Sequence, residues 1–245
     1  MDLSIKKFMK YHLPPSILRL IRLRKDKEYN TLSPEQIFTK IYERNLWGNP
    51  VNANDQFYSG SGSHREEELS VYIAAVGEFF GSFDVKPNVV DLGCGDFAVG
   101  SQIRKFCNNY VACDVVPGLI DFNKNRFNNL AVDFMALNIV DDPLPPGDVA
   151  IVRQVLQHLS NLQVNHFISR ARSTYRYIIV SEHLPGKPGF EHNVDKITGP
   201  GTRMGYDSGI VLTSPPFNLR PAFERQLCCV KSVDPGIILT TLYGM

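Results

Sequence analysis

The chain has 245 residues, of which 43% are hydrophobic and 21% charged, and its formal net charge is +1. This length and composition predict one ordinary globular domain with extensions and a sizeable core. The near-zero charge argues against a nucleic-acid-binding protein that depends on a basic field over the whole domain.

The cysteines and the apolar runs exclude further classes. Five cysteines occur with no C-x-x-C spacing, and such an odd, unpatterned set predicts reduced thiols in a cytoplasmic protein rather than a zinc site or a disulfide framework. No apolar run approaches the roughly 20 residues of a transmembrane helix. Neither the histidines nor the acidic residues have the spacing of a ligand cluster, so we expect no metal.

Residues 1–30 form a basic segment that differs from the rest of the chain. Within "SIKKFMKYHLPPSILRLIRLRKDKEYN", the apolar residues after the two prolines form a broad arc with arginines on the other side. Such an arm either lies on an anionic membrane surface or packs on its own domain or on a partner subunit. We therefore expect a cytoplasmic protein, with contact at the inner face of the membrane through this arm as one alternative.

Residues 31–83 are expected to form two helices joined by a lid. The stretch "SPEQIFTKIYERNLW" begins a helix, because Ser33 and Gln36 form a capping box around a proline. Ser63 and Glu66 form a second capping box ahead of the next apolar stripe. Between the helices, "NPVNANDQFYSGSGSHREEE" is polar and rich in glycine and serine, so we expect it to cover a site rather than join the core.

Residues 84–245 alternate between strand and helix patterns, which predicts a parallel sheet wrapped by helices. Two β-rich runs, "RQLCCVKSV" and "GIILTTLYGM", close the chain with a hairpin signal at Asp234-Pro235-Gly236. The long glycine-rich insertion at 186–209 is expected to form part of an acceptor pocket. We predict strands at 88–92, 110–114, 130–136, 148–153 and 177–182, and helical segments at 98–108, 117–128 and 160–174.

The stretch "NVVDLGCGDFAVG" has the form of a nucleotide-binding turn after a strand. Gly93 and Gly95 allow a ligand to approach the backbone, and the following helix points its N-terminus there. Asp91 and Asp96 bracket this turn, and a carboxylate a few ångströms from a diphosphate costs on the order of kilocalories per mole. A ligand with positive charge, such as S-adenosylmethionine, suits these acids better than a dinucleotide.

Asp114 ends the second predicted strand, where a carboxylate can accept hydrogen bonds from both ribose hydroxyls. Dinucleotide enzymes use the same device, so Asp114 alone does not distinguish the two ligands. "DLGCGD" followed by this acid resembles the class I S-adenosylmethionine-dependent methyltransferases over residues 88–183. The resemblance implies a Rossmann-like α/β fold with a seven-stranded, mostly parallel sheet whose last strand is antiparallel, and S-adenosylmethionine as cofactor. The alternative is a degenerate nucleotide-binding fold.

A narrower resemblance covers residues 47–221. "SGSGS", "DLGCGDF", "NIVDDPLP", "RQVLQHLSN" and "SPPFNLRP" occur in the order of a bacterial methyltransferase family with the motifs SGxGS, CGDF, DITxDPLP, RDVLxHLS and PPFNLPxP. Asn138 and Gln154 each replace an aspartate of this pattern. The resemblance implies that Asn138 and the Ile139 backbone bind the adenine, since an amide carbonyl can accept as a carboxylate does. The second change, at Gln154, puts in doubt a charged group at the substrate site.

"SPPF" also suggests the D/N-P-P-Y/F motif of amino-directed DNA methyltransferases. That motif ends the fourth strand, whereas "SPPF" follows the fifth strand and begins with serine. We therefore expect no nucleic-acid substrate, and we expect Phe217 to form a wall beside the substrate or to pack in the core.

Catalytic candidates follow strands four and five, because open α/β sheets bind ligands at the carboxyl ends of their strands. His183 is the first candidate for a general base, and Glu182 would orient it or bind an acceptor hydroxyl. His158 is either a second candidate base or a brace for the helix that follows. Arg153 lies at the cofactor or holds a phosphate or carboxylate of the acceptor, unless it forms an internal salt bridge.

The lid supplies further candidates: Tyr58 and Ser61 at the cofactor and His64 at the substrate. The leading hypothesis is O-methylation of a sugar, sugar phosphate or nucleotide-linked sugar of a bacterial surface glycan. The alternatives are N- or O-methylation of another small metabolite, with a phosphate oxygen as one acceptor, and a non-catalytic cofactor-binding module.

Overall fold

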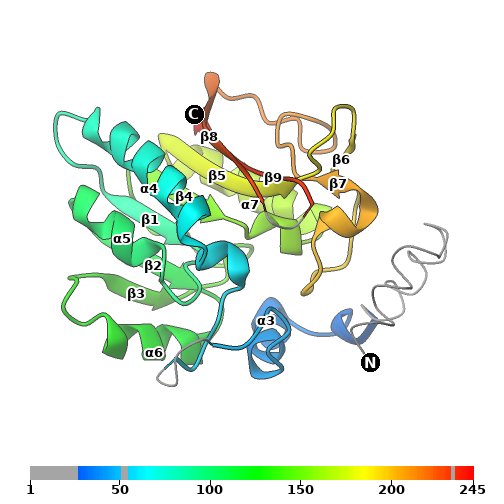
Figure 1. Ribbon diagram of the computed structural model, residues 1–245, viewed down its shortest axis with the longest axis horizontal. Helices are drawn as coiled ribbons and strands as arrows, with labels where there is room; N and C mark the ends of the chain where they lie inside the picture. Colours follow the sequence, from blue (N-terminus) through cyan, green and yellow to red (C-terminus); the bar gives the residue numbers. More distant parts are fainter. Residues whose placement is uncertain (1–26, 51–54, 233–234) are drawn as a thin grey trace.

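A computed structural model describes residues 27–50, 55–232 and 235–245 (Figure 1). The predicted basic arm therefore lies almost wholly outside the described residues. In the part of the chain that is described, no helix is long and apolar enough to cross a membrane.

One seven-stranded sheet forms the centre of the molecule, in the order β3-β2-β1-β4-β5-β9-β8 (Figure 1). β1 to β5 are parallel, and β9 runs antiparallel between β5 and β8. This confirms the predicted class I methyltransferase sheet, including the closing hairpin. The strands are β1 (Val89–Leu92), β2 (Tyr110–Asp114), β3 (Asp133–Ala136), β4 (Val149–Arg153), β5 (Tyr177–Leu184), β8 (Phe223–Lys231) and β9 (Ile237–Gly244).

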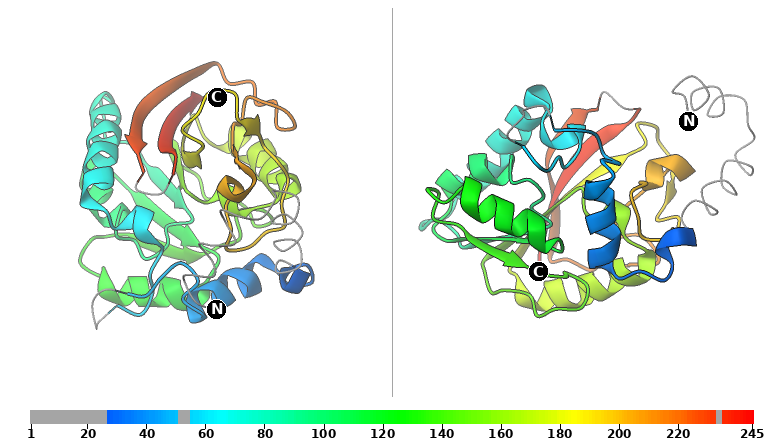
Figure 2. Two further views of the ribbon diagram at one scale, coloured as in Figure 1. Left: turned by 45° about the vertical axis from the view of Figure 1, so that its right-hand side comes forward. Right: turned by 90° about the horizontal axis from the view of Figure 1, so that it is seen from below.

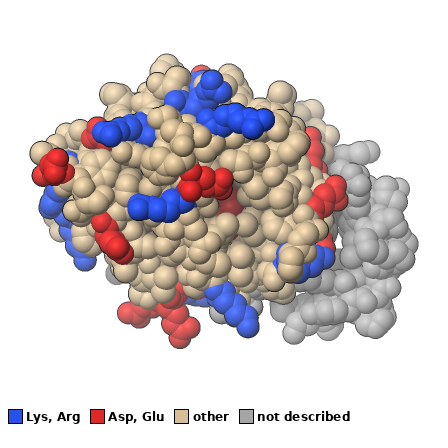
Figure 3. All heavy atoms as spheres, turned by 90° about the horizontal axis from the view of Figure 1, so that it is seen from above, with Lys and Arg blue, Asp and Glu red and all other residues tan. Residues whose placement is uncertain are grey.

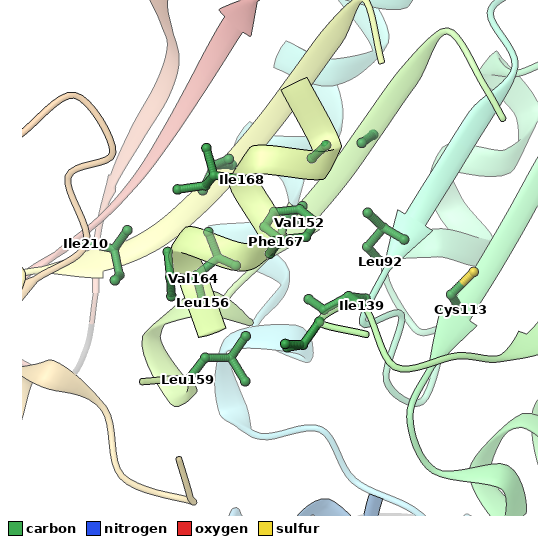
Figure 4. Close-up of a cluster of buried hydrophobic side chains, with 14 of the residues drawn as sticks. Leu92, Cys113, Ile139, Val152, Leu156, Leu159, Val164, Phe167, Ile168 and Ile210 are labelled. Carbon is green, nitrogen blue, oxygen red and sulfur yellow. The ribbon is translucent and has the colours of Figure 1, made fainter. Parts of the chain in front are cut away.

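Helices cover the two faces of this sheet (Figures 1 and 2). On one face, α4 (Glu66–Gly81) and α5 (Gly100–Ile103) pack over alternate strand residues such as Val89 and Ile151. On the other face, α7 (Asn161–Thr174) inserts Val164 and Phe167 against Val152 of β4, as Figure 4 shows. The strict alternation along buried parallel strands means that neighbouring residues serve opposite faces.

Two further helices complete the wrapping. α6 (Pro117–Arg126) packs along β2 and β3. α3 (Pro34–Glu43) lies beyond the carboxyl ends of the strands (Figure 2), and its capping box from Ser33 to Gln36 is confirmed. The predicted helix at 98–108 is short, since α5 ends at Ile103 and a 3-10 turn, Arg104–Phe106, follows it.

One predicted helix start is wrong. α4 begins at Glu66 after Arg65, without a side-chain cap, while Ser63 ends a separate 3-10 turn, Ser61–Ser63. Ser63 belongs instead to this turn of the lid. Its backbone N–H donates to the carbonyl of Gly60, and the N–H of His64 donates to the carbonyl of Ser61. The capping box of α7, from Ser160 to Gln163, was not predicted.

The insertion at 186–209 is packed, not loose. Its short strands β6 (Glu191–His192) and β7 (Ser208–Gly209) pair with each other. Arg203 is fully buried and donates hydrogen bonds to the carbonyls of Val194, Leu156 and Leu159 and to Oδ1 of Asn161. The insertion is thereby fastened to the turn that follows β4.

Candidate active site

A cavity of ≈300 Å³ opens at the carboxyl ends of the parallel strands. Its floor is the glycine turn after β1 and the ends of β2, β4 and β5, and its cover is α3, the lid and the insertion at 186–209. Eleven of the sequence-predicted site residues line this cavity: Ser61, Asp91, Gly93, Gly95, Asp114, Asn138, Ile139, Arg153, Gln154, His158 and His183.

The glycine turn leaves room for a ligand only because it lacks side chains. Gly93 and Gly95 adopt φ values of 87° and 57°. A Cβ on Gly93 would lie 2.4 Å from Cγ2 of Val155, and one on Gly95 would lie 2.3 Å from Oγ of Ser59. Both conformation and space therefore require glycine here, and the backbone itself forms the wall of the cavity.

Two buried carboxylates sit beside this turn. Asp114 accepts hydrogen bonds from the backbone N–H of Gly95 and of Val116, each at 3.1 Å. Burial raises its pKa to about 6 although these amides favour the ionised form. Asp91 accepts from the hydroxyl of Tyr110 at 2.9 Å, and burial raises its pKa to about 7. The cavity thus presents acidic groups to its ligand and suits a cationic part of it.

The sequence predicts that Asp96 faces the ligand, but its carboxylate is hydrogen-bonded to the lid. Oδ2 accepts from the backbone N–H of Ser59 at 2.8 Å and contacts Nε2 of His64 at 2.7 Å. In return, the N–H of Asp96 donates to Oγ of Ser59 at 2.7 Å, and that hydroxyl also bonds to Tyr42. We call this set of contacts the lid clasp: Tyr42, Ser59, His64 and Asp96.

The lid residues divide into two groups. The segment 59–63 lines the cavity. Tyr58 and His64 instead stack on each other, with ring centroids 4.6 Å apart, behind the segment that lines it. The predictions that Tyr58 meets the cofactor and that His64 meets the substrate are corrected in this respect, since both rings serve the lid itself.

Asn138 and Ile139 line the cavity in the loop after β3. The Asn138 side chain is turned back into this loop, where Oδ1 accepts from the N–H of Val140 and Nδ2 donates to Asp141. An adenine contact by this pair stays a prediction. Ile139 is buried beside Asn138, and its carbonyl accepts from Nη1 of Arg170 at 3.3 Å.

β4 ends in a strained turn that carries two predicted residues. Gln154 has φ 56°. Its side chain lies against the lid, since a Cβ added to Gly62 would lie 2.5 Å from Oε1 of Gln154. Arg153 donates from Nη2 to the carbonyl of Gly62 at 2.8 Å and places its guanidinium 5.1 Å from the centroid of the Tyr72 ring. Both side chains therefore lie between the sheet and the lid.

His183 and Glu182 lie on opposite faces of β5, as neighbouring strand residues must. His183 faces the cavity, whereas Glu182 is buried on the α7 side and accepts from the N–H of Leu156 at 3.2 Å. Burial raises the pKa of Glu182 to about 8, against the effect of nearby Arg203. The prediction that Glu182 orients His183 is wrong for this reason: the carboxyl group supports the turn that follows β4.

His158 lines the cavity from that same turn but is buried among aromatic rings. Its ring centroid lies 4.9 Å from that of Trp47 and 6.5 Å from that of Phe38. Burial lowers its pKa to about 3, so the imidazole is neutral. An imidazole with so low a pKa is a weak base, which fits the bracing role better.

Phe217 takes the second of its predicted roles. It is buried in the core shared with α7 and does not line the cavity. The residues that prediction from sequence missed are instead aromatic ones, Phe38, Tyr42 and Trp47, which cover the cavity from α3 and the loop after it. The helical spacing of Phe38 and Tyr42 indicated only a buried stripe, and Trp47 lies beyond the end of α3.

On the face shown in Figure 3, basic and acidic side chains are interspersed. Within the described ranges, no group of three or more His, Cys, Asp or Glu side chains could hold a metal ion.

Comparisons with known proteins give one family match, over part of the chain, and one shared fold. Residues 90–172 match the family described as a methyltransferase domain. The fold is similar to that of the N-methyltransferase NodS from Bradyrhizobium japonicum WM9 in complex with S-adenosyl-L-homocysteine, at 15% identity and a TM-score of 0.59 over 84% of this chain and 97% of NodS. Among curated proteins no significant sequence match was found.

Two further structures share the fold. Magnesium protoporphyrin IX methyltransferase from Synechocystis PCC 6803, with bound S-adenosylmethionine, is 14% identical, with a TM-score of 0.54 over 88% of this chain and 99% of that one. Human N-acetylserotonin methyltransferase is 18% identical, with a TM-score of 0.50 over 89% and 61%.

The family match spans the part of the chain that builds the floor of the cavity. It runs from β1 through the glycine turn and Asp114 to α7. The family match, the order of the seven strands and the acid-lined glycine turn agree with one another. The chain is an enzyme with a class I, S-adenosylmethionine-dependent methyltransferase domain.

Proposed function

We propose that the enzyme methylates a hydroxyl group of a sugar, sugar phosphate or nucleotide-linked sugar in bacterial surface-glycan biosynthesis. The cavity beyond the glycine turn supports a hydrophilic acceptor, because its lining includes Arg153, Gln154, Gln157, Thr202 and His183. The sequence motifs shared with a bacterial family of small-molecule and surface-glycan methyltransferases support the same class. The five cysteines, all free thiols, support a reaction in the cytoplasm.

In this proposal, different residues of the cavity bind different parts of the cofactor. The backbone of Gly93 and Gly95 would hold the methionyl part, and Asp114 would accept hydrogen bonds from the ribose hydroxyls. When bound, S-adenosylmethionine supplies a methyl group activated by its sulfonium, so the protein need only align the acceptor and remove its proton.

His183 carries the proposal, because it is the imidazole that faces the cavity from the end of β5. Nε2 of His183 is buried against the turn between β8 and β9. A Cβ added to Gly236 in this turn would lie 3.0 Å from that nitrogen. We therefore assign the base to Nδ1. Nδ1 would accept the proton that the acceptor hydroxyl loses as its oxygen receives the methyl group, and the sulfur of the cofactor would keep the electron pair of its broken bond to that methyl group.

The test is a screen of S-adenosylhomocysteine release over neutral sugars, sugar phosphates and nucleotide-linked sugars, followed by the variants His183→Asn and His183→Ala. General-base catalysis contributes about 10²-fold or more. Both variants should lower kcat by at least that factor and leave the Kd of S-adenosylhomocysteine unchanged, and the wild-type rate should rise with pH as the base loses its proton.

His166→Asn is the matched control, because His166 lies exposed on α7. It should keep the wild-type rate. Turnover of a sugar acceptor by both His183 variants at the wild-type rate would show that this imidazole is not the base. Turnover only with amine acceptors would replace the proposal by N-methylation of another metabolite.

A further inference from the structure

Arg153, which is half-buried, differs from the fully buried Arg203 in how its guanidinium is satisfied. The Arg203 side chain, fully buried, donates to three carbonyls and one amide oxygen. For Arg153, one hydrogen bond is found among the described residues, from Nη2 to Gly62, and its buried Nε has no hydrogen-bond partner there. The fold saturates one arginine and leaves donors of the other available.

No carboxylate of the described residues forms an ion pair with Arg153. Among the residues described, none of the ion pairs within 4.0 Å includes it. The two acids that act on it from a distance are already engaged, Glu68 with Arg65 at 3.2 Å and Asp91 with the hydroxyl of Tyr110. Burying a guanidinium without a paired anion is costly, and burial lowers its pKa accordingly. An anionic ligand group would offset that cost.

The position of Arg153 relates it to the proposed base. β4 and β5 are parallel, with Arg153 beside Ser181, and both Ser181 and His183 project to the same face as Arg153. His183 therefore lies one strand across and two residues further along. Strand spacing of about 4.8 Å and a rise of about 3.3 Å per residue separate the two backbones by roughly 8 Å. Arg153 and His183 thus project from neighbouring strands on the same face of the sheet, and both line the cavity.

We propose that the acceptor carries a carboxylate or phosphate and that Arg153 binds this group, presenting a hydroxyl of the same molecule to His183. The guanidinium offers a fork of donors that matches both anions. This rests on the proposed function and narrows it, because it selects sugar phosphates, nucleotide-linked sugars and uronic acids over neutral sugars. The methionyl carboxylate of the cofactor has the same chemistry and is the competing source of the anion.

The experiment measures binding, not turnover, so that its failure is separate from a failure of the proposed base. Inorganic phosphate is titrated calorimetrically into the protein saturated with S-adenosylhomocysteine. Wild type should bind phosphate, and Arg153→Gln should weaken that binding at least 10-fold. Arg153→Lys, which keeps the charge without the fork, should lie between them. Arg172→Gln, at an exposed position in the last turn of α7, is the control and should bind as wild type does.

A second titration identifies the source of the anion. S-adenosylhomocysteine and its decarboxylated analogue, which keeps the amine, are compared on wild type and Arg153→Gln. Their Kd values should change less than 3-fold between the two proteins if Arg153 serves the acceptor. Absence of phosphate binding to the saturated wild type overturns the proposal. So does a selective loss of S-adenosylhomocysteine affinity, with the decarboxylated analogue unaffected, since the arginine then binds the carboxylate of the cofactor.

Discussion

Asp114 shows how one side chain joins the fold to the cofactor. Its two oxygens hold the N–H groups of Gly95 and Val116, so the carboxylate shapes the glycine turn and, at the same time, faces the cavity. Each carboxylate oxygen can accept a second hydrogen bond, which leaves capacity for the ribose hydroxyls. The acid that the sequence places at the end of β2 therefore has a structural and a binding role together.

A pH dependence of cofactor binding follows from this arrangement. The pKa of Asp114 is raised to about 6 by burial, and a protonated carboxyl group is a poorer acceptor for the ribose hydroxyls. The affinity for S-adenosylhomocysteine should therefore fall as pH decreases through about 6. Asp114→Asn should weaken binding by about 1–3 kcal/mol at pH 8, the range for a lost bond to a charged group, and flatten the pH profile.

Calorimetry between pH 5 and pH 8 measures both effects. Asp121→Asn, at an exposed position on α6, is the control and should keep the wild-type profile. An Asp114→Asn protein that binds as tightly as wild type at pH 8 would contradict the assigned role.

At the scale of elements, the lid is held to the glycine turn by hydrogen bonds between segments 37 residues apart in the sequence. Ser59 and Asp96 bond reciprocally, backbone to side chain, and His64 adds a charged contact. The hydrogen bond to Asp96 raises the pKa of His64 above its ordinary value of 6.5. The lid clasp is therefore complete while the imidazole is protonated, and its ionic part is lost as pH rises through that raised pKa.

Opening of the lid should control release of the bound cofactor. Ser59→Ala removes the acceptor of the Asp96 N–H and the contact with Tyr42, two bonds worth about 1 kcal/mol each. Stopped-flow measurement of S-adenosylhomocysteine dissociation should show a rate roughly 10-fold or more above wild type. Ser70→Ala, on the exposed side of α4, should release at the wild-type rate. Equal rates in Ser59→Ala and wild type would mean that the clasp does not gate the site.

The lid also marks the limit of prediction from the sequence. Strands β1, β2, β4 and β5 and the glycine turn were predictable because apolar runs, glycines and terminal acids act locally. The clasp was not, since Asp96 and Ser59 meet only after the fold has formed. Strand alternation predicts which face of the sheet Glu182 occupies. Its hydrogen bond with the N–H of Leu156, in the turn after β4, depends on tertiary structure. The apolar spacing of α3 indicates burial and carries no sign that it covers a cavity.

At the scale of the whole molecule, the cavity is bordered by parts that lie far apart in the sequence. Its walls come from α3, the lid, the ends of strands on both sides of β1, and the insertion at 186–209. A ligand that fills it touches all of these at once, so its binding free energy is also folding free energy. The cofactor is thus expected to stabilise the N-terminal helices together with the sheet.

A thermal-shift comparison of ligands tests this expectation. At 100 times its Kd, S-adenosylhomocysteine should add about 2.7 kcal/mol to the free energy of unfolding, which for a chain of this size raises Tm by about 5–10 °C. S-adenosylmethionine should act in the same way. NAD should not raise Tm, because its diphosphate would lie beside the buried acids Asp91 and Asp114. Asp114→Asn should reduce the shift at a fixed ligand concentration, through its weaker binding. An equal shift with NAD would show that the acids beside the glycine turn do not select the ligand.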